Sequence, residues 1–98
     1  MIFCLSILAY AQTPQDRATE LKKQAQSSLN QKDYIKARYL FKKAYEAFAT
    51  RGNYPQAIEC GVQANALYVR ENFYKEGFEL CRDMDQLIWT GEQNQKKV

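Results

Sequence analysis

Apolar residues from position 18 onward recur at steps of three and four, a spacing that places them on one face of an α-helix. The pattern also returns every twenty residues, starting from Tyr34, Tyr54 and Tyr74. A fixed period of this kind predicts an all-α helical repeat protein. The aligned sets are Ala37, Ala57 and Gly77; Leu40, Cys60 and Leu80; Phe41, Gly61 and Cys81; Ala44, Ala64 and Met84; Ala47, Leu67 and Leu87; and Phe48, Tyr68 and Ile88.

The segments between the turns predict four helices, over residues 15–31, 34–50, 54–71 and 74–90. Their connections are too short for anything but antiparallel neighbours, so we expect two helical hairpins, stacked as a fragment of an α-solenoid. The first helix has its own apolar stripe, made by Ala18, Leu21, Ala25, Ser28 and Leu29. Hairpins 15–50 and 54–90 would then form one domain over 12–90, followed by a polar tail or the start of another repeat over 91–98.

Turn residues and the third helix add detail to this prediction. Asp33 and Asn53 are expected to be N-caps, because their side chains can accept from free amides of the first turn. Pro55 falls in the first turn, where its missing amide hydrogen costs nothing. The third helix carries a second apolar strip of Ile58, Val62 and Val69. A helix that is apolar on two sides is expected to lie between two neighbours.

The residue pattern resembles that of the tetratricopeptide repeat family. In the first hairpin the resemblance is carried by Ala25, Asp33, Tyr34, Ala37, Phe41 and Ala44, and in the second by Tyr74, Gly77, Cys81 and Met84. The resemblance covers nearly all of 15–90. The unit here has forty residues rather than the usual thirty-four, and no proline closes the first hairpin. These departures are similar to those of the longer, divergent repeats in exported N-terminal regions of regulators and sensor kinases from Bacteroidetes-type bacteria.

The resemblance also implies a binding surface, because family members bind partners on the inner wall formed by the first helix of each hairpin. By position these residues are Thr19, Lys22, Gln26 and Asn30 in the first hairpin, and Glu59, Val62, Ala66 and Arg70 in the second. Lys22 and Gln26 fit only partly the lysine–asparagine clamp by which chaperone-binding members hold a carboxylate. The third helix offers no second clamp, so we do not assign the chain to that subclass.

Charge is distributed unevenly along the chain. Nine Lys and Arg face four Asp and Glu over 12–51, against five and seven over 52–98. A basic half can attract nucleic acid or another polyanion. No aromatic residues alternate with these charges, however, which favours a solvated helix exterior.

Candidate chemistry is sparse, and we expect neither catalysis nor a cofactor. The chain has no histidine, so a histidine–cysteine metal site or catalytic dyad is excluded. Asp83 and Asp85 lie on different faces of their helix and cannot act as a carboxylate pair. Cys60 and Cys81 lie at nearly the same level of the second hairpin. They form either a disulfide or two free buried thiols, the second being favoured by the angle between their positions.

Residues 1–11 are apolar and uncharged and end in Ala-Tyr-Ala, a pattern typical of a secretory signal, although the positive n-region is missing. The alternative is an apolar turn packed on the domain. The segment is shorter than the roughly 20 residues that span a bilayer. At the other end, Phe78 and Trp89 lie off the repeated stripe. We therefore expect them to be exposed, and further repeats of the chain to follow Val98 and cover them.

These observations favour a protein–protein interaction scaffold, exported to the periplasm or cell envelope and forming the sensing or binding part of a larger bacterial regulator. Its expected partner is a protein or peptide, with no small-molecule substrate. The alternative is a basic helical module for nucleic acid or another polyanion, which export disfavours and a steep salt dependence of binding would support.

The apolar lead generates a first prediction. If residues 1–11 are a cleaved signal, N-terminal sequencing of the exported protein should give Gln12 as the first residue, because signal peptidase cuts after small residues at alternating positions. A cytosolic protein that retains Met1 would contradict the prediction.

Overall fold

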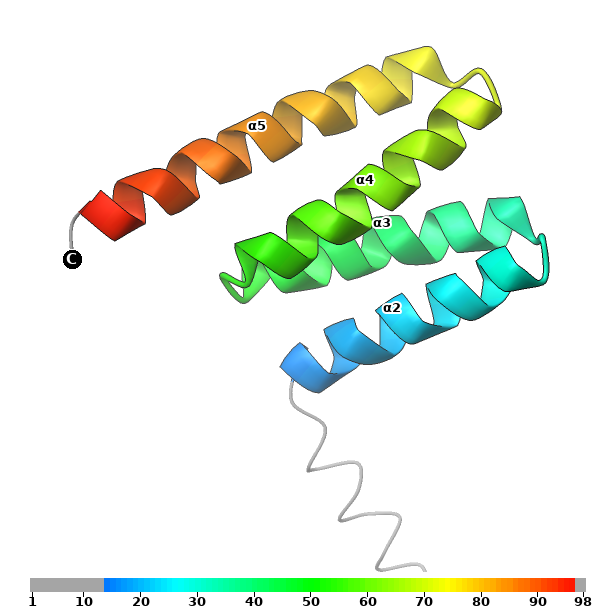
Figure 1. The fold of residues 1–98 in the computed structure, drawn as a ribbon, viewed down its shortest axis with the longest axis horizontal. Helices are drawn as coiled ribbons and strands as arrows, with labels where there is room; N and C mark the ends of the chain where they lie inside the picture. Colours follow the sequence, from blue (N-terminus) through cyan, green and yellow to red (C-terminus); the bar gives the residue numbers. More distant parts are fainter. Residues whose placement is uncertain (1–13, 97–98) are drawn as a thin grey trace, which may run out of the picture.

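The computed structural model describes residues 14–96, which form four helices and, within that range, no strand. They are α2 (Pro14–Asn30), α3 (Tyr34–Thr50), α4 (Tyr54–Arg70) and α5 (Tyr74–Lys96). Each helix packs against the next one along the chain, and the chain reverses direction at every turn (Figure 1). The predicted all-α architecture of stacked helical hairpins is confirmed. The expected signal segment, residues 1–11, lies outside the described residues.

The fourth helix is longer than predicted. The first three helices begin and end within one residue of expectation, whereas α5 continues to Lys96 instead of ending at residue 90. Gly91 does not stop the helix, since its φ is not in the left-handed region. Its missing side chain instead lets the Tyr54 ring lie close: a Cβ at position 91 would be 3.1 Å from Tyr54 Cδ2. Residues 91–96 therefore continue α5.

The three turns between the helices share one backbone conformation. Lys32, Gly52 and Asn72 have φ values of 63°, 79° and 67°, and in each turn the next helix begins two residues later. In each turn the amide of the positive-φ residue donates to the carbonyl three residues earlier. The amide of the next residue donates to the carbonyl five residues before it, at 2.8–2.9 Å. This is the Schellman motif, which satisfies the last carbonyls of a helix. The twenty-residue period of the sequence therefore corresponds to the recurrence of this turn.

The predicted N-caps differ in how they act. The Asp33 side chain accepts from the backbone N–H of Lys36 at 3.3 Å, as predicted. Asn53 occupies the equivalent position, but its side chain makes no capping hydrogen bond. The α4 helix begins instead with Pro55 in its first turn, which brings a suitable φ and needs no acceptor.

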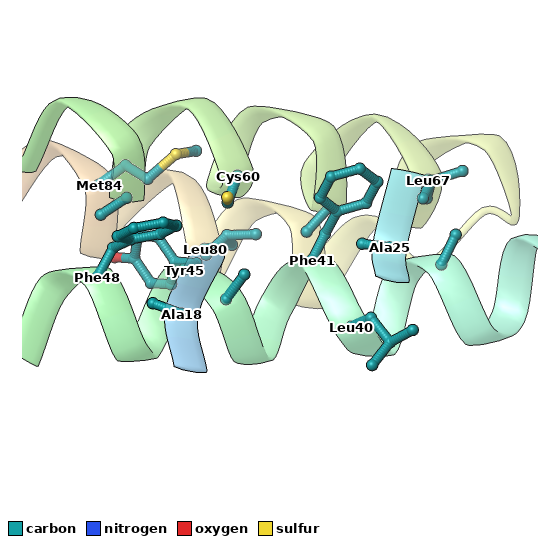
Figure 2. Close-up of a cluster of buried hydrophobic side chains, with 14 residues drawn as sticks. Ala18, Ala25, Leu40, Phe41, Tyr45, Phe48, Cys60, Leu67, Leu80 and Met84 are labelled. Carbon is teal, nitrogen blue, oxygen red and sulfur yellow. The ribbon is translucent and has the colours of Figure 1, made fainter. Parts of the chain in front are cut away.

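The core is a single stripe of mostly small residues that joins all four helices. Figure 2 shows Phe41, Ala25 and Leu67 towards one end, and Tyr45, Phe48 and Met84 gathered at the other. The alanines at the predicted contact positions are completely buried: Ala18, Ala25, Ala37, Ala44, Ala57 and Ala64. Small side chains let helix axes approach closely, and the large aromatic residues of α3 fill the remaining space between the helices.

Two glycines allow the closest helix contacts. A Cβ on Gly61 would lie 2.6 Å from Met84 Sδ and 3.0 Å from Tyr45 Cδ1, and one on Gly77 would lie 2.7 Å from Asn65 Oδ1. Both glycines are buried inside helices. Glycine costs about 1 kcal/mol relative to alanine in a helix, and close contact offsets that cost. Close packing against neighbouring helices therefore explains why glycine stands at both positions.

As expected, α4 lies between two neighbours, α3 and α5, but its second apolar strip is not enclosed. Ile58 is half-buried against the core, but Val62 and Val69 are exposed. The buried stripe of α4 serves α3 and α5 together, because its smallest residue, Gly61, contacts Tyr45 on one side and Met84 on the other. One stripe therefore meets both neighbours, and the second strip faces solvent.

The turns generate a second prediction. Gly52→Ala should lower the free energy of unfolding by about 1–2 kcal/mol, because a side chain disfavours the left-handed conformation. A Cβ at position 52 would meet no atom within 4 Å, so the whole loss of stability would come from the backbone conformation. Lys32→Gly should raise it by up to about 1 kcal/mol for the converse reason.

Chemical denaturation measures both effects, with Gln31→Gly as the matched control. Gln31 is exposed and has no positive φ, so glycine there should only lower stability. A loss of stability in Lys32→Gly as large as in the control would contradict the role of the turn.

Candidate functional site

The eight residues predicted to form the binding wall lie on α2 and α4. Seven of them are exposed and one, Lys22, is half-buried. We call this set the α2–α4 face; it consists of Thr19, Lys22, Gln26, Asn30, Glu59, Val62, Ala66 and Arg70.

Lys22 joins the two helices of this face. Its Nζ donates to Gln56 Oε1 at 2.8 Å and lies 3.0 Å from Glu59 Oε1. The lysine side chain is 19% exposed and the glutamate 54%. A pair this open to solvent contributes little stability. Its significance is geometric, because it shows that alternate helices, α2 and α4, lie within reach of each other.

The far end of the face is fixed differently. The Arg70 guanidinium lies over the Tyr34 ring, 4.1 Å from its centroid, which links the end of α4 to the start of α3. Gln26, Asn30, Val62 and Ala66 are exposed between the two ends. The structure therefore brings Lys22 and Glu59 together, directs Arg70 towards α3, and leaves the middle of the face open.

A cation–aromatic cluster that the sequence did not reveal fixes the second hairpin on the first. Arg38 of α3 lies over the rings of Tyr68 and Phe73, at 5.2 and 4.8 Å from their centroids. Its Nη1 is also 3.1 Å from Glu71 Oε2, although not aligned for a hydrogen bond. A guanidinium can stack on aromatic faces while keeping an ion pair. These partners are thirty to thirty-five residues from Arg38, so no local pattern could identify them.

Sequence reasoning also missed a groove between the start of α4 and the end of α5. It has a volume of about 570 Å³ and is lined by Gly52, Tyr54, Pro55, Ile58, Leu87, Ile88, Gly91 and Glu92. The expected end of the helix at residue 90 concealed this groove, because Gly91 and Glu92 were assigned to a tail. Elsewhere on α5, Phe78 and Trp89 are 67% and 60% exposed, which confirms their predicted exposure.

Cys60 and Cys81 are free thiols, so the candidate disulfide is not formed. Cys60 is completely buried in the core, whereas Cys81 is half-buried and its sulfur accepts from Asn65 Nδ2 at 3.3 Å. Burial raises the pKa of the Cys60 thiol to about 11, with nearby Lys22 lowering it and Glu59 raising it. Cys60 is thus a small apolar core residue at neutral pH.

The remaining candidate groups are dispersed. Glu76, Glu79, Asp83 and Asp85 are all exposed on α5. Over residues 14–96, no three His, Cys, Asp or Glu side chains lie close enough together to hold a metal ion. A search of the same residues for a helix long and apolar enough to cross a membrane finds none.

Comparison with known proteins identifies no relative of this chain. The chain matches no family model, and neither a curated protein nor a solved structure is similar enough to match it.

The cysteines generate a third prediction. Iodoacetamide at pH 8 should alkylate Cys81 well before Cys60, because Cys60 is buried and a pKa of about 11 leaves roughly one thiol in a thousand ionised. Peptide mapping by mass spectrometry separates the sites. In denaturant the two rates should converge, and a pair that resists alkylation until reduced would show a disulfide.

Proposed function

We propose that this protein is an interaction scaffold that binds a protein or peptide segment on the α2–α4 face. The observation that carries the proposal is the contact of Lys22 with Gln56 and Glu59, because it makes one continuous surface of two helices. Surfaces shared between successive repeats are where solenoid proteins bind their partners.

The composition of the face favours a peptide-like ligand. Gln26 and Asn30 offer amides, which both donate and accept hydrogen bonds. Val62 and Ala66 offer small apolar contacts beside them. Lys22 and Glu59 neutralise each other, so the face has little net charge to attract a polyanion. Amide and apolar groups in alternation suit a polypeptide, whose backbone and side chains present the same two kinds of group.

We also propose that the scaffold belongs to the tetratricopeptide-like repeats and acts outside the cytoplasm, as the binding part of a larger bacterial regulator. The resemblance of its packing residues to that family supports the first part. The buried alanines and the close-contact glycines occupy the positions at which such repeats need small residues. The apolar lead over 1–11, which ends in Ala-Tyr-Ala, supports export.

Site-specific photocrosslinking tests the binding face and is the fourth prediction. A benzophenone amino acid at Gln26 or Ala66 should crosslink the full chain to a protein in the source cells, because both positions are exposed on the proposed face. The same probe at Lys43 is the matched control, since Lys43 is exposed on α3 and its side chain lies over the ring of Tyr39.

Crosslinks of equal yield from all three positions would contradict a defined binding face. Crosslinks to nucleic acid, strongest at Lys43 and lost as salt is raised, would replace the proposal with the polyanion alternative.

A further inference from the structure

The first hairpin shows how this protein covers a helical hairpin. Four side chains of α2 and α3 contact α4 or the turn that follows it. Lys22 binds Gln56 and Glu59, and Tyr34 stacks on Arg70. Arg38 lies over the ring of Tyr68, and Tyr45 lies close to Gly61. These four positions define the surface of the first hairpin that α4 covers.

The second hairpin presents the same surface without a cover. The two hairpins repeat with a period of forty residues, as the turn residues Lys32 and Asn72 show. The residues that correspond to the four covered positions are Val62, Tyr74, Phe78 and Asp85, and all four are exposed. Val62 and Phe78 stand where the first hairpin has lysine and arginine, the tyrosine is kept, and Asp85 stands where the first hairpin has Tyr45. The uncovered surface is therefore more apolar at two of the four positions and carries a carboxylate at the fourth.

The groove at the end of the second hairpin belongs to this surface. Its residues Ile58 and Ile88 correspond to Ala18 and Phe48 of the first hairpin, which are 0% and 2% exposed in the core. Ile88 is 45% exposed. Together with the groove, exposed apolar side chains of α4 and α5 form what we call the α4–α5 edge: Val62, Val69, Tyr74, Phe78, Ile88 and Trp89.

At the opposite end of the molecule, the outer face of α2 is polar. The buried stripe of α4 consists of Ala57, Cys60, Ala64 and Leu67 among others. The residues forty positions earlier, on α2, are Arg17, Glu20, Gln24 and Ser27, all exposed. A polar outer face is what the terminal repeat of a solenoid needs. The α2 helix of a second copy could not replace α4 on the edge, because it would bury these polar groups.

Two copies joined edge to edge are also disfavoured, by charge. Two carboxylates belong to this surface, because Asp85 is one of the four corresponding positions and Glu92 lines the groove. Like charges brought together oppose association, and an acidic surface favours a basic partner.

We propose that the α4–α5 edge docks an amphipathic helix of a partner protein in the pose that α4 takes on α2 and α3. The partner helix presents small and apolar residues at the spacing of Ala57, Gly61 and Ala64, and carries basic residues beside them. This surface is separate from the α2–α4 face and touches it only at Val62.

A peptide with the sequence of α4 tests this proposal. The probe is residues 54–70 with Glu59→Lys and Gln63→Lys, which keeps the small apolar stripe and adds basic flanks. It is titrated into the full chain at low and high salt. Trp89 is the only tryptophan of the chain and the probe has none, so a blue shift of its emission reports burial of the edge. We expect saturable binding, weaker at high salt because of the charged flanks.

Matched variants locate the binding. Phe78→Glu should weaken it at least tenfold, whereas Ile35→Glu, at an equally exposed residue of α3, should leave it unchanged. Both variants are first checked for native helix content and thermal midpoint. A probe carrying Ala57→Lys should fail to bind the unaltered chain, because the contact stripe is interrupted.

Other results would overturn the proposal. These are the absence of binding, or binding that survives Phe78→Glu, which would place the peptide on α2 and α3 after displacing α4. Self-association of the free chain that Phe78→Glu abolishes would assign the edge to a second copy instead. Crosslinking from Gln26 and Ala66 is independent of all these outcomes, so failure of one surface leaves the other standing.

Discussion

The structure depends on ending one helix and starting the next within three residues. A helix leaves its last carbonyls and the next helix leaves its first amides without partners, and so short a turn has few groups to offer them. The left-handed residue at positions 32, 52 and 72 solves the first half of this problem, because it directs two amides back to the carbonyls of the finished helix. The next helix begins two residues later. The positions of the buried residues along each helix follow from this turn geometry.

The turn sets where small residues are required. Ala37, Ala57 and Gly77 each come four residues after the residue that precedes a helix, and each donates its amide to the carbonyl of that preceding residue at 2.9–3.0 Å. All three are buried. Small residues there bring the backbones together, and larger residues further along, such as Phe41 and Leu80, fill the wider space. The core is therefore narrow, and much of each helix remains available as surface.

The sequence predicted what is periodic and missed what joins distant positions. Helix bounds, buried alanines and the exposure of Phe78 followed from spacing alone. The end of α5 did not, since the spacing predicted a helix only to residue 90, whereas the helix continues to Lys96. The candidate face was predicted as two rows of residues, but not that Lys22 would link them. Partners so far apart in the chain depend on how helices stack, which spacing within one helix does not encode.

The period has a further consequence for how such a chain can change in length. Because the turn recurs once per helix and not once per hairpin, each step of growth or loss is one helix of twenty residues. Adding or removing an odd number of helices moves the chain terminus to the opposite end of the helices. It also exchanges which helices form the inner wall and which lie outside it. An even number preserves both. Domains fused to such a chain would therefore emerge on one side or the other according to the parity of its helices.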